Sequence, residues 1–185
     1  LRLSPPVGYL DFTSLLLGSV AMKCTQSSRV PVVVVREPVS GWPAGSVVVG
    51  VDGSDGSACA LRWAASEAAL HGRRLRVVHG WDTAFAVPPG GMAVAPLDDR
   101  SFVEESRRTV ARFVDESLAG TTMTAPIDIV PIPALAPRAL IEQSSDAALL
   151  VVGSRGRGSL AGLVLGSVSQ QCLHHAACPV AIVPS

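Results

Sequence analysis

Hydrophobic and polar positions follow one another in blocks along residues 46–185, and the apolar blocks predict strands. Each block is a short run rich in Val, Ile, Leu and Ala, a pattern typical of strands buried on both faces of a sheet. Turn residues or amphipathic segments separate the runs. The predicted strands are Ser46–Val51, Leu75–His79, Ile127–Val130, Ala147–Val152 and Val180–Val183.

The segments between these runs show the spacing of amphipathic helices. Ser54 or Asp55 is a suitable N-cap for a helix that extends to about His71. Three further helices are predicted over residues 100–119, 136–145 and 166–175. Residues 82–99 form a long loop rich in Pro and Gly, with a closing lid and disorder as open interpretations. Alternating strands and helices predict an α/β fold, a parallel sheet with helices on both faces.

A glycine-rich segment follows the fourth predicted strand and carries the clearest chemical signal. It reads V-V-G-S-R-G-R-G-S-L-A-G-L-V-L-G-S-V and ends at Val168. Gly153 and Gly156 are separated by two residues, and nine more residues precede Gly166. Backbone N–H groups of such a loop converge on an anion, and the N-terminus of the next helix adds its positive dipole end. The segment therefore predicts phosphate binding rather than bond breaking.

Asp52 and Gly153 both stand just beyond the end of a predicted strand. Ligands of open α/β sheets bind at the carboxyl ends of strands, where the winding direction reverses. If the two strands are neighbours, the carboxylate and the glycine loop share one crevice. The alternatives are a helix-capping carboxylate and a plain turn between strand and helix.

Part of the glycine motif occurs twice. Leu-Gly-Ser-Val starts at Leu17 and again at Leu165, and a following Cys and a Pro-Val pair keep the same offset of 148 residues. Repeat units of this size are whole domains. We therefore expect residues 1–37 to be the C-terminal remnant of a first domain, residues 38–45 to be a linker, and residues 46–185 to be a complete domain. The initial Leu leaves a fragment, a truncated gene product and a mis-assigned start as open interpretations.

The remnant contains its own apolar run at Val32–Val35. An isolated strand edge seeks a partner, so we expect this run to pair with the last strand of the complete domain or to join chains together. Pro5 stands where Gly153 aligns, and an Asp-bearing strand is missing from the remnant. The remnant is therefore not expected to form a complete nucleotide site.

Composition excludes several classes of function. Net charge is zero and only 4% of residues are aromatic, which disfavours nucleic acid as a partner. The one lysine, Lys23, lies in the remnant, so a Walker A lysine and a Schiff-base lysine are not expected. The apolar run Leu15–Met22 is too short for a bilayer and follows no basic segment, which predicts a cytoplasmic protein without a membrane partner.

A cluster of Cys172, His174, His175 and Cys178 could suggest zinc, which needs four converging ligands. On one helix these residues divide between two faces, so we expect no metal site. His79 follows a strand, but no nucleophile with a third partner is identifiable by spacing. We expect it to be structural, and we expect no catalytic residue.

Residues 46–185 resemble the universal stress protein family, specifically its ATP-binding branch and its tandem-repeat type. Four motifs carry the resemblance: V-D-G-S, V-V-G-S-R-G, L-G-S-V-S and C-P-V-A-I-V, which begin at Val51, Val151, Leu165 and Cys178. The resemblance implies a Rossmann-like fold similar to that of the adenine-nucleotide α-hydrolases. Its sheet would have five parallel strands in the order 3-2-1-4-5.

The resemblance also implies a site for ATP or ADP with Mg²⁺ or Mn²⁺. Asp52 would contact the adenosine moiety, the end of the second strand would face adenine, and the glycine loop with its following Ser-Val would hold the phosphates. The residues implied to contact the nucleotide are Gly50, Val51, Asp52, Gly80, Val152, Gly153, Arg155, Gly156, Gly166, Ser167 and Val168.

The function implied is that of a nucleotide-dependent stress-response regulator with slow or no ATP hydrolysis. It would form a homodimer through its last strand, and an unknown downstream protein would read the nucleotide state. One alternative is a nucleotide-free dimerisation module of the same fold. Another is an α-hydrolase-type enzyme, which usually carries S-G-G-x-D-S after the first strand. Here that position reads V-D-G-S-D-G-S, which disfavours the enzyme.

Overall fold

The computed structural model describes residues 19–35, 44–81, 99–122, 124–158 and 165–185. Predictions for the start of the remnant, most of the linker, the long loop and part of the glycine motif lie outside the described residues. The described elements, in chain order, are α1 (Ser19–Ser27), β1 (Val32–Val34), β2 (Ser46–Gly50), α2 (Asp55–Leu70), β3 (Leu75–Gly80), α3 (Asp99–Leu118), β4 (Ile127–Ile132), α4 (Ala136–Gln143), β5 (Ala147–Gly153), α5 (Ser167–His175) and β6 (Val180–Val183).

The strands form one six-stranded sheet in the order β1-β6-β5-β2-β3-β4. The five strands β6, β5, β2, β3 and β4 are parallel to one another, while β1 pairs with β6 antiparallel. The predicted α/β class is confirmed. The predicted five-stranded sheet in the order 3-2-1-4-5 is wrong for the sheet as a whole, because β1 adds an antiparallel strand at one edge.

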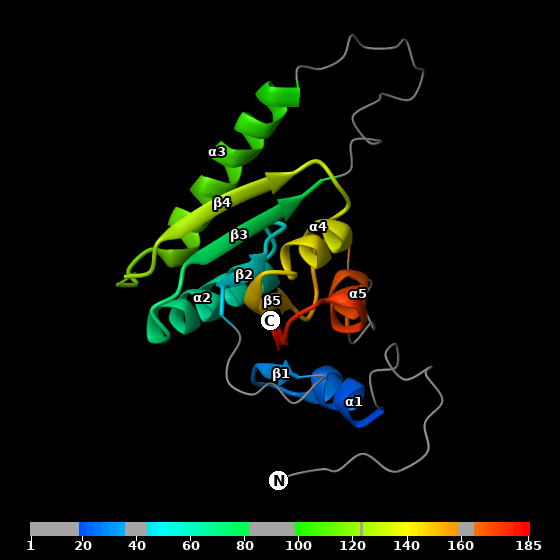
Figure 1. Ribbon diagram of the computed structural model, residues 1–185. Helices are drawn as coiled ribbons and strands as arrows, with labels where there is room; N and C mark the ends of the chain where they lie inside the picture. The colour runs from blue at the N-terminus through cyan, green and yellow to red at the C-terminus, as the bar shows by residue number, and fades with distance from the viewer. Residues whose placement is uncertain (1–18, 36–43, 82–98, 123, 159–164) are drawn as a thin grey trace, which may run out of the picture.

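Helices cover both faces of the sheet (Figure 1). On one face, α2 and α3 pack on side chains such as Val47 and Val49. On the other face, α4 and α5 pack on Val48, which lies between Val47 and Val49 in β2. Met22 of α1 packs against the same group of buried side chains. Successive side chains of a strand point to opposite faces, so a strand covered on both sides must be apolar at every position. This is why the central strands read as continuous apolar runs.

The turn after β2 decides where α2 begins. Ser54 has extended backbone angles, and its hydroxyl oxygen accepts a hydrogen bond from the backbone N–H of Ser57 at 3.2 Å. Ser54 is therefore the N-cap, and Asp55 lies in the first turn, where its charge suits the helix dipole. The structure selects Ser54 from the two caps that the sequence left open.

Strand β4 is longer than predicted. The sequence indicated a strand ending at Val130, but pairing with β3 continues to Ile132 and includes Pro131. Proline lacks a backbone N–H, so within sheets it is found on edge strands and at strand ends. β4 is the edge strand opposite β1, so Pro131 is tolerated there.

The apolar run predicted at Val32–Val35 pairs with β6, as expected. β1 lies antiparallel to β6, with Val33 opposite Ala181 at the centre of the register. The edge of β6 that a homodimer through the last strand would use is therefore occupied by the same chain. Homodimer formation and the division into residues 1–37, 38–45 and 46–185 stay predictions.

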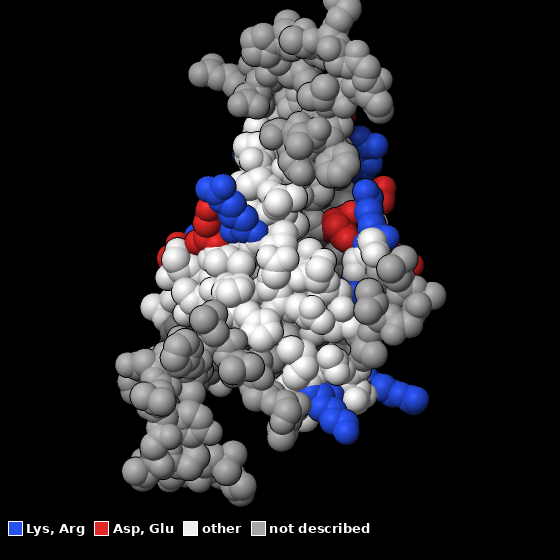
Figure 2. Space-filling model, turned by 90° about the vertical axis from the view of Figure 1, so that its right-hand side faces the viewer, with Lys and Arg blue, Asp and Glu red and all other residues white. Residues whose placement is uncertain are grey.

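Surface charge is mixed on the face that Figure 2 shows. Basic and acidic side chains lie around a centre of uncharged residues there, so that face carries no extended patch of one sign. This fits the zero net charge of the chain. Within the described ranges, no helix is both long enough and apolar enough to cross a bilayer.

Deleting residues 1–40 should leave β6 with a bare edge. We expect the shortened protein to self-associate or lose solubility, because an unpaired strand edge pairs with another chain. Sedimentation velocity at matched concentrations measures this. Deletion of residues 1–18 alone is the control, since it keeps α1 and β1. Unchanged sedimentation and solubility after the longer deletion would contradict the capping role of β1.

Candidate functional site

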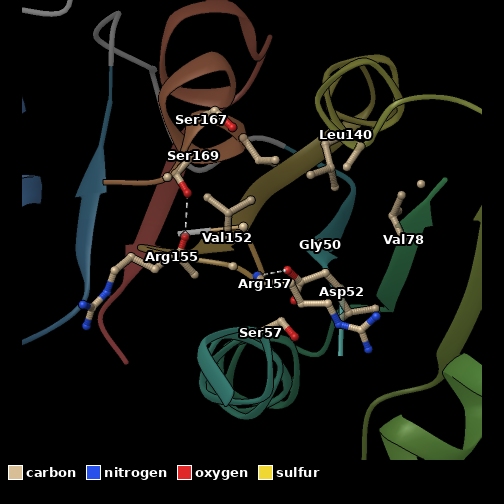
Figure 3. A pocket seen from close by; sticks show the side chains of 18 residues that line it. Gly50, Asp52, Ser57, Val78, Leu140, Val152, Arg155, Arg157, Ser167 and Ser169 are labelled. Carbon is tan, nitrogen blue, oxygen red and sulfur yellow. Dashed lines mark hydrogen bonds between the residues drawn. The ribbon is translucent and has the colours of Figure 1, made fainter. Parts of the chain in front are cut away.

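A pocket lies at the carboxyl ends of the central strands, where the connections from β2 and β5 leave the sheet in different directions (Figure 3). Its cavity of about 210 Å³ is far larger than a water molecule needs. Every residue that the sequence proposed for the nucleotide site lines this pocket. Val78 also lines it, at the end of the second predicted strand, which the resemblance placed against adenine. The sequence reasoning did not include the other lining residues: Ser57, Ala136, Leu140, Arg157, Gly158 and Ser169.

The two central strands bring the pocket together. β2 and β5 are parallel neighbours, with Val49 opposite Val151. The segment after β2 therefore places Asp52 beside the glycine loop that follows β5. The sequence analysis predicted a shared crevice only if these two strands are neighbours, and the structure confirms that they are.

The Asp52 carboxylate accepts hydrogen bonds on both oxygens. Oδ1 accepts from the backbone N–H of Ser54 at 3.0 Å and from its hydroxyl at 2.6 Å. Oδ2 accepts from the backbone N–H of Arg157 at 2.9 Å, so the carboxylate joins the turn after β2 to the loop after β5. Burial alone would raise the pKa of Asp52. The hydrogen bonds from Ser54 and Arg157 outweigh burial and hold that pKa below its usual value of 3.8.

Two glycines of the loop allow this close approach. A Cβ on Gly156 would lie against the Asp52 carboxylate, and a Cβ on Gly153 would lie 2.9 Å from the carbonyl oxygen of Gly56. A side chain at Gly153 would push the loop away from the first turn of α2, and a side chain at Gly156 would displace the Asp52 carboxylate. Backbone packing therefore requires Gly153, and Gly156 leaves the room that the Asp52 carboxylate occupies, which a plain flexible turn would not explain.

The N-terminus of α5 opens toward the pocket. Its N-cap is Gly166, which has no side chain to cap the first N–H groups of the helix. Ser167, Val168 and Ser169 of the first turn line the cavity. The first N–H groups of a helix have no partner within the helix, so this turn offers donors and a positive dipole end to the pocket. The Ser169 hydroxyl donates to the carbonyl oxygen of Gly153 at 2.6 Å and holds the loop to the helix.

The two arginines of the loop point in different directions. The sequence proposed Arg155 as an added charge, but its guanidinium donates to the Ser185 hydroxyl at 3.0 Å and is directed away from Asp52 (Figure 3). Arg155 lines the pocket, and its proposed contribution of charge to the nucleotide stays a prediction. The guanidinium of Arg157 instead lies next to Gly53, whose φ of +80° and missing Cβ make room for it.

An apolar wall completes the pocket between β3, β5 and α4. Val78, Leu140 and Val152 contribute side chains, and Ala136 lies at the start of α4. Gly80 packs tightly there, since a Cβ on it would lie 2.8 Å from the Ala136 Cα. No short motif marks the α4 residues. One signal could have found them: α4 follows β4, so its start lies near the carboxyl ends of the parallel strands, where the pocket is.

The residues considered for zinc do not form a metal site. The described part of the chain contains no group of three or more His, Cys, Asp or Glu side chains placed to hold a metal ion. Burial, with a smaller effect of Cys178, raises the pKa of the Cys172 thiol to about 12, so it stays protonated. His79 lies 2.8 Å through Nδ1 from the carbonyl oxygen of Val51, which fits a structural role.

Comparisons with known proteins agree on one family. The model of the universal stress protein family matches residues 44–184. A universal stress protein of Mycobacterium tuberculosis is 35% identical over 173 residues, which cover 90% of this chain and 56% of that protein. The chain spans about half the length of the curated relatives it matches.

Two solved structures extend the comparison to the fold. One, a universal stress protein in complex with cAMP, is 27% identical with a TM-score of 0.52 and covers 76% of this chain and 96% of its own. The other, from Archaeoglobus fulgidus, is 20% identical with a TM-score of 0.63 and covers 96% of this chain and 59% of its own. With the motifs, the sheet and the match over residues 44–184 together, the chain belongs to the universal stress protein family.

Proposed function

We propose that this chain binds an adenine nucleotide, ATP or ADP with Mg²⁺ or Mn²⁺, and acts as a nucleotide-dependent regulator of a stress response. One observation carries the proposal. A single pocket combines an uncapped helix N-terminus, a tightly packed glycine loop and an apolar wall. These parts suit the phosphates and the base of one ligand.

The phosphate end of the ligand would lie at α5. The first turn of this helix supplies backbone donors, and the Ser167 hydroxyl adds another. The loop glycines let the phosphates approach the backbone without side chains in between. Arg157 belongs to the same loop, and its guanidinium beside Gly53 would add positive charge to the pocket.

The nucleoside end would lie against the apolar wall. Val78, Leu140 and Val152 provide a surface for a flat base. Asp52 stays ionised at neutral pH and can accept hydrogen bonds from ribose hydroxyl groups on its remaining lone pairs. The related structure that holds cAMP supports an adenine nucleotide as the ligand class.

A divalent cation would fit this site only if the phosphates of the nucleotide coordinate it. Asp52 is the single carboxylate among the described residues that line the pocket, and both its oxygens already accept hydrogen bonds. Mg²⁺ commonly binds through substrate phosphates and water rather than through a cage of protein ligands. When bound, the cation would neutralise charge on the phosphates.

The same arrangement favours binding over hydrolysis. The pKa of Asp52 is held below its usual value, so its carboxylate is a poor base for activating water. We therefore propose that hydrolysis is slow or absent. The bound nucleotide would shift the populations of loop or assembly states, and a downstream protein would read that shift.

Isothermal titration with ATP and Mg²⁺ tests the proposal. We expect binding by the native protein and at least a tenfold loss in Gly156→Ala, about 1.4 kcal/mol, because the added methyl meets the Asp52 carboxylate. Gly158→Ala is the matched control. A Cβ at Gly158 meets no atom within 4 Å, so its affinity should stay within about twofold. No binding by well-folded native protein would favour the nucleotide-free module instead.

Arg157 and Arg155 should differ in their effect on affinity. We expect Arg157→Gln to weaken ATP binding about fivefold, or about 1 kcal/mol, while adenosine binding stays unchanged. Arg155→Gln should leave both affinities unchanged, because its guanidinium contacts Ser185. Competition titrations with ATP and adenosine measure the difference. Equal losses of ATP affinity in the two variants would contradict the proposed role of Arg157 in phosphate binding.

Asp52 should also give the fold a defined pH dependence. Its folded pKa is lowered, so the ionised form stabilises the protein at neutral pH, and this stabilisation is lost as the pH falls through the folded pKa. We expect the difference in unfolding free energy between native protein and Asp52→Asn to be constant above about pH 5 and to shrink below the usual value of 3.8. Urea unfolding at stepped pH measures it. A difference that does not change with pH would exclude the assignment.

A further inference from the structure

The side chain of His79 makes a hydrogen bond at the nucleoside end of the pocket, on the side where Figure 3 shows Asp52 and Val78. Its Nδ1 lies 2.8 Å from the carbonyl oxygen of Val51. A carbonyl oxygen only accepts, so the ring carries a proton on Nδ1 and donates it. Val51 and both chain neighbours of His79 line the pocket, whereas His79 is not among the described lining residues. The ring therefore acts on the pocket through Val51.

The His79 ring lies on the face of the sheet opposite the apolar wall. Val78 belongs to the group of side chains that α4 and α5 cover, so the next residue points toward α2 and α3. Trp81 stacks with the ring there, with centroids 6.3 Å apart and planes inclined by 22°. This stack fixes the plane of the ring and directs Nδ1 at the Val51 carbonyl.

The bond from His79 takes the place of one that a regular sheet would form. β2 and β3 pair in parallel as far as Gly50, which lies opposite Val78. The Val51 N–H continues the ladder and donates to the Val78 carbonyl at 3.0 Å. In a regular parallel ladder the Val51 carbonyl would then accept from the N–H of Gly80. Among the described residues it accepts from His79 instead.

The Gly80 N–H is consequently separated from its expected strand partner. The N–H of Trp81 donates to Ile132 of β4, and successive N–H groups of a central strand point to opposite neighbours. The Gly80 N–H therefore faces β2, where the Val51 carbonyl is engaged by the His79 ring. Because Gly80 also lines the pocket, its N–H is a backbone donor at the nucleoside end.

We propose that His79 is a positioning residue that makes this pocket selective for adenine over guanine. By holding the Val51 carbonyl, its ring keeps the Gly80 N–H free to donate to the base. Adenine presents an acceptor at N1, where guanine presents an N–H group, so a backbone donor favours adenine. The inference rests on the proposed function, because it requires a base at this end of the pocket.

Competition titrations with ATP and GTP, each with Mg²⁺, test the role of His79. The variant His79→Phe keeps an aromatic ring beside Trp81 but has no Nδ1 donor, so the Val51 carbonyl is left to accept from Gly80. We expect ATP affinity to fall about tenfold and GTP affinity to change by less than about threefold, which lowers the preference for ATP. A merely structural role would weaken both nucleotides alike.

His79→Asn is the conservative variant, because its amide nitrogen can donate to the Val51 carbonyl. We expect it to keep the preference for ATP within about threefold of the native value. Trp81→Phe is the matched control, since it changes the ring beside His79 without removing the donor, and it should also keep the preference. A preference as low in His79→Asn as in His79→Phe would contradict the proposal.

Amide hydrogen exchange of the ligand-free protein tests the free donor without any nucleotide. We expect the Gly80 amide to exchange at least about tenfold faster than that of Val78, which lies in the paired part of β3, and to slow in His79→Phe. A Gly80 amide as protected as that of Val78, or an unchanged preference in His79→Phe, would overturn the role of His79 alone. Native protein that binds neither ATP nor GTP would overturn the proposed function and the base contact with it.

Discussion

The structure depends on the close approach of two chain segments at the carboxyl ends of its central strands. The turn after β2 and the loop after β5 meet through one hydrogen bond, from the backbone N–H of Arg157 to Asp52. Packing of Gly153 against Gly56 brings the same loop onto the first turn of α2. Without this approach the helix end, the carboxylate and the apolar wall would not share one cavity.

That contact also fixes the electrostatic character of the pocket. Asp52 is ionised, yet its charge is compensated by donors from Ser54 and Arg157. The α5 end of the cavity faces donor groups and a positive dipole end. An anion can therefore enter beside a carboxylate without strong repulsion, because that carboxylate is engaged with the backbone.

Much of this architecture could be predicted because buried parallel strands are apolar on both faces and leave a strong pattern. The glycine spacing and Asp52 likewise led to residues that line one pocket. Other features depend on tertiary geometry that spacing does not encode. The direction of Arg155 is set by the distant Ser185 hydroxyl, and Leu140 reaches the pocket from a helix without a motif. Pro131 lies within a strand only because that strand is at the edge.

The pairing of β1 with β6 has a consequence for the order of folding. β1 leaves the ribosome before any other strand of the sheet, and its partner leaves last. Contacts between such distant segments carry a large loop-closure cost, so they form after the local βα units. The five parallel strands can assemble before the edge closes, and β1 then completes the sheet. Until synthesis reaches Val183, β1 lacks its partner in this sheet.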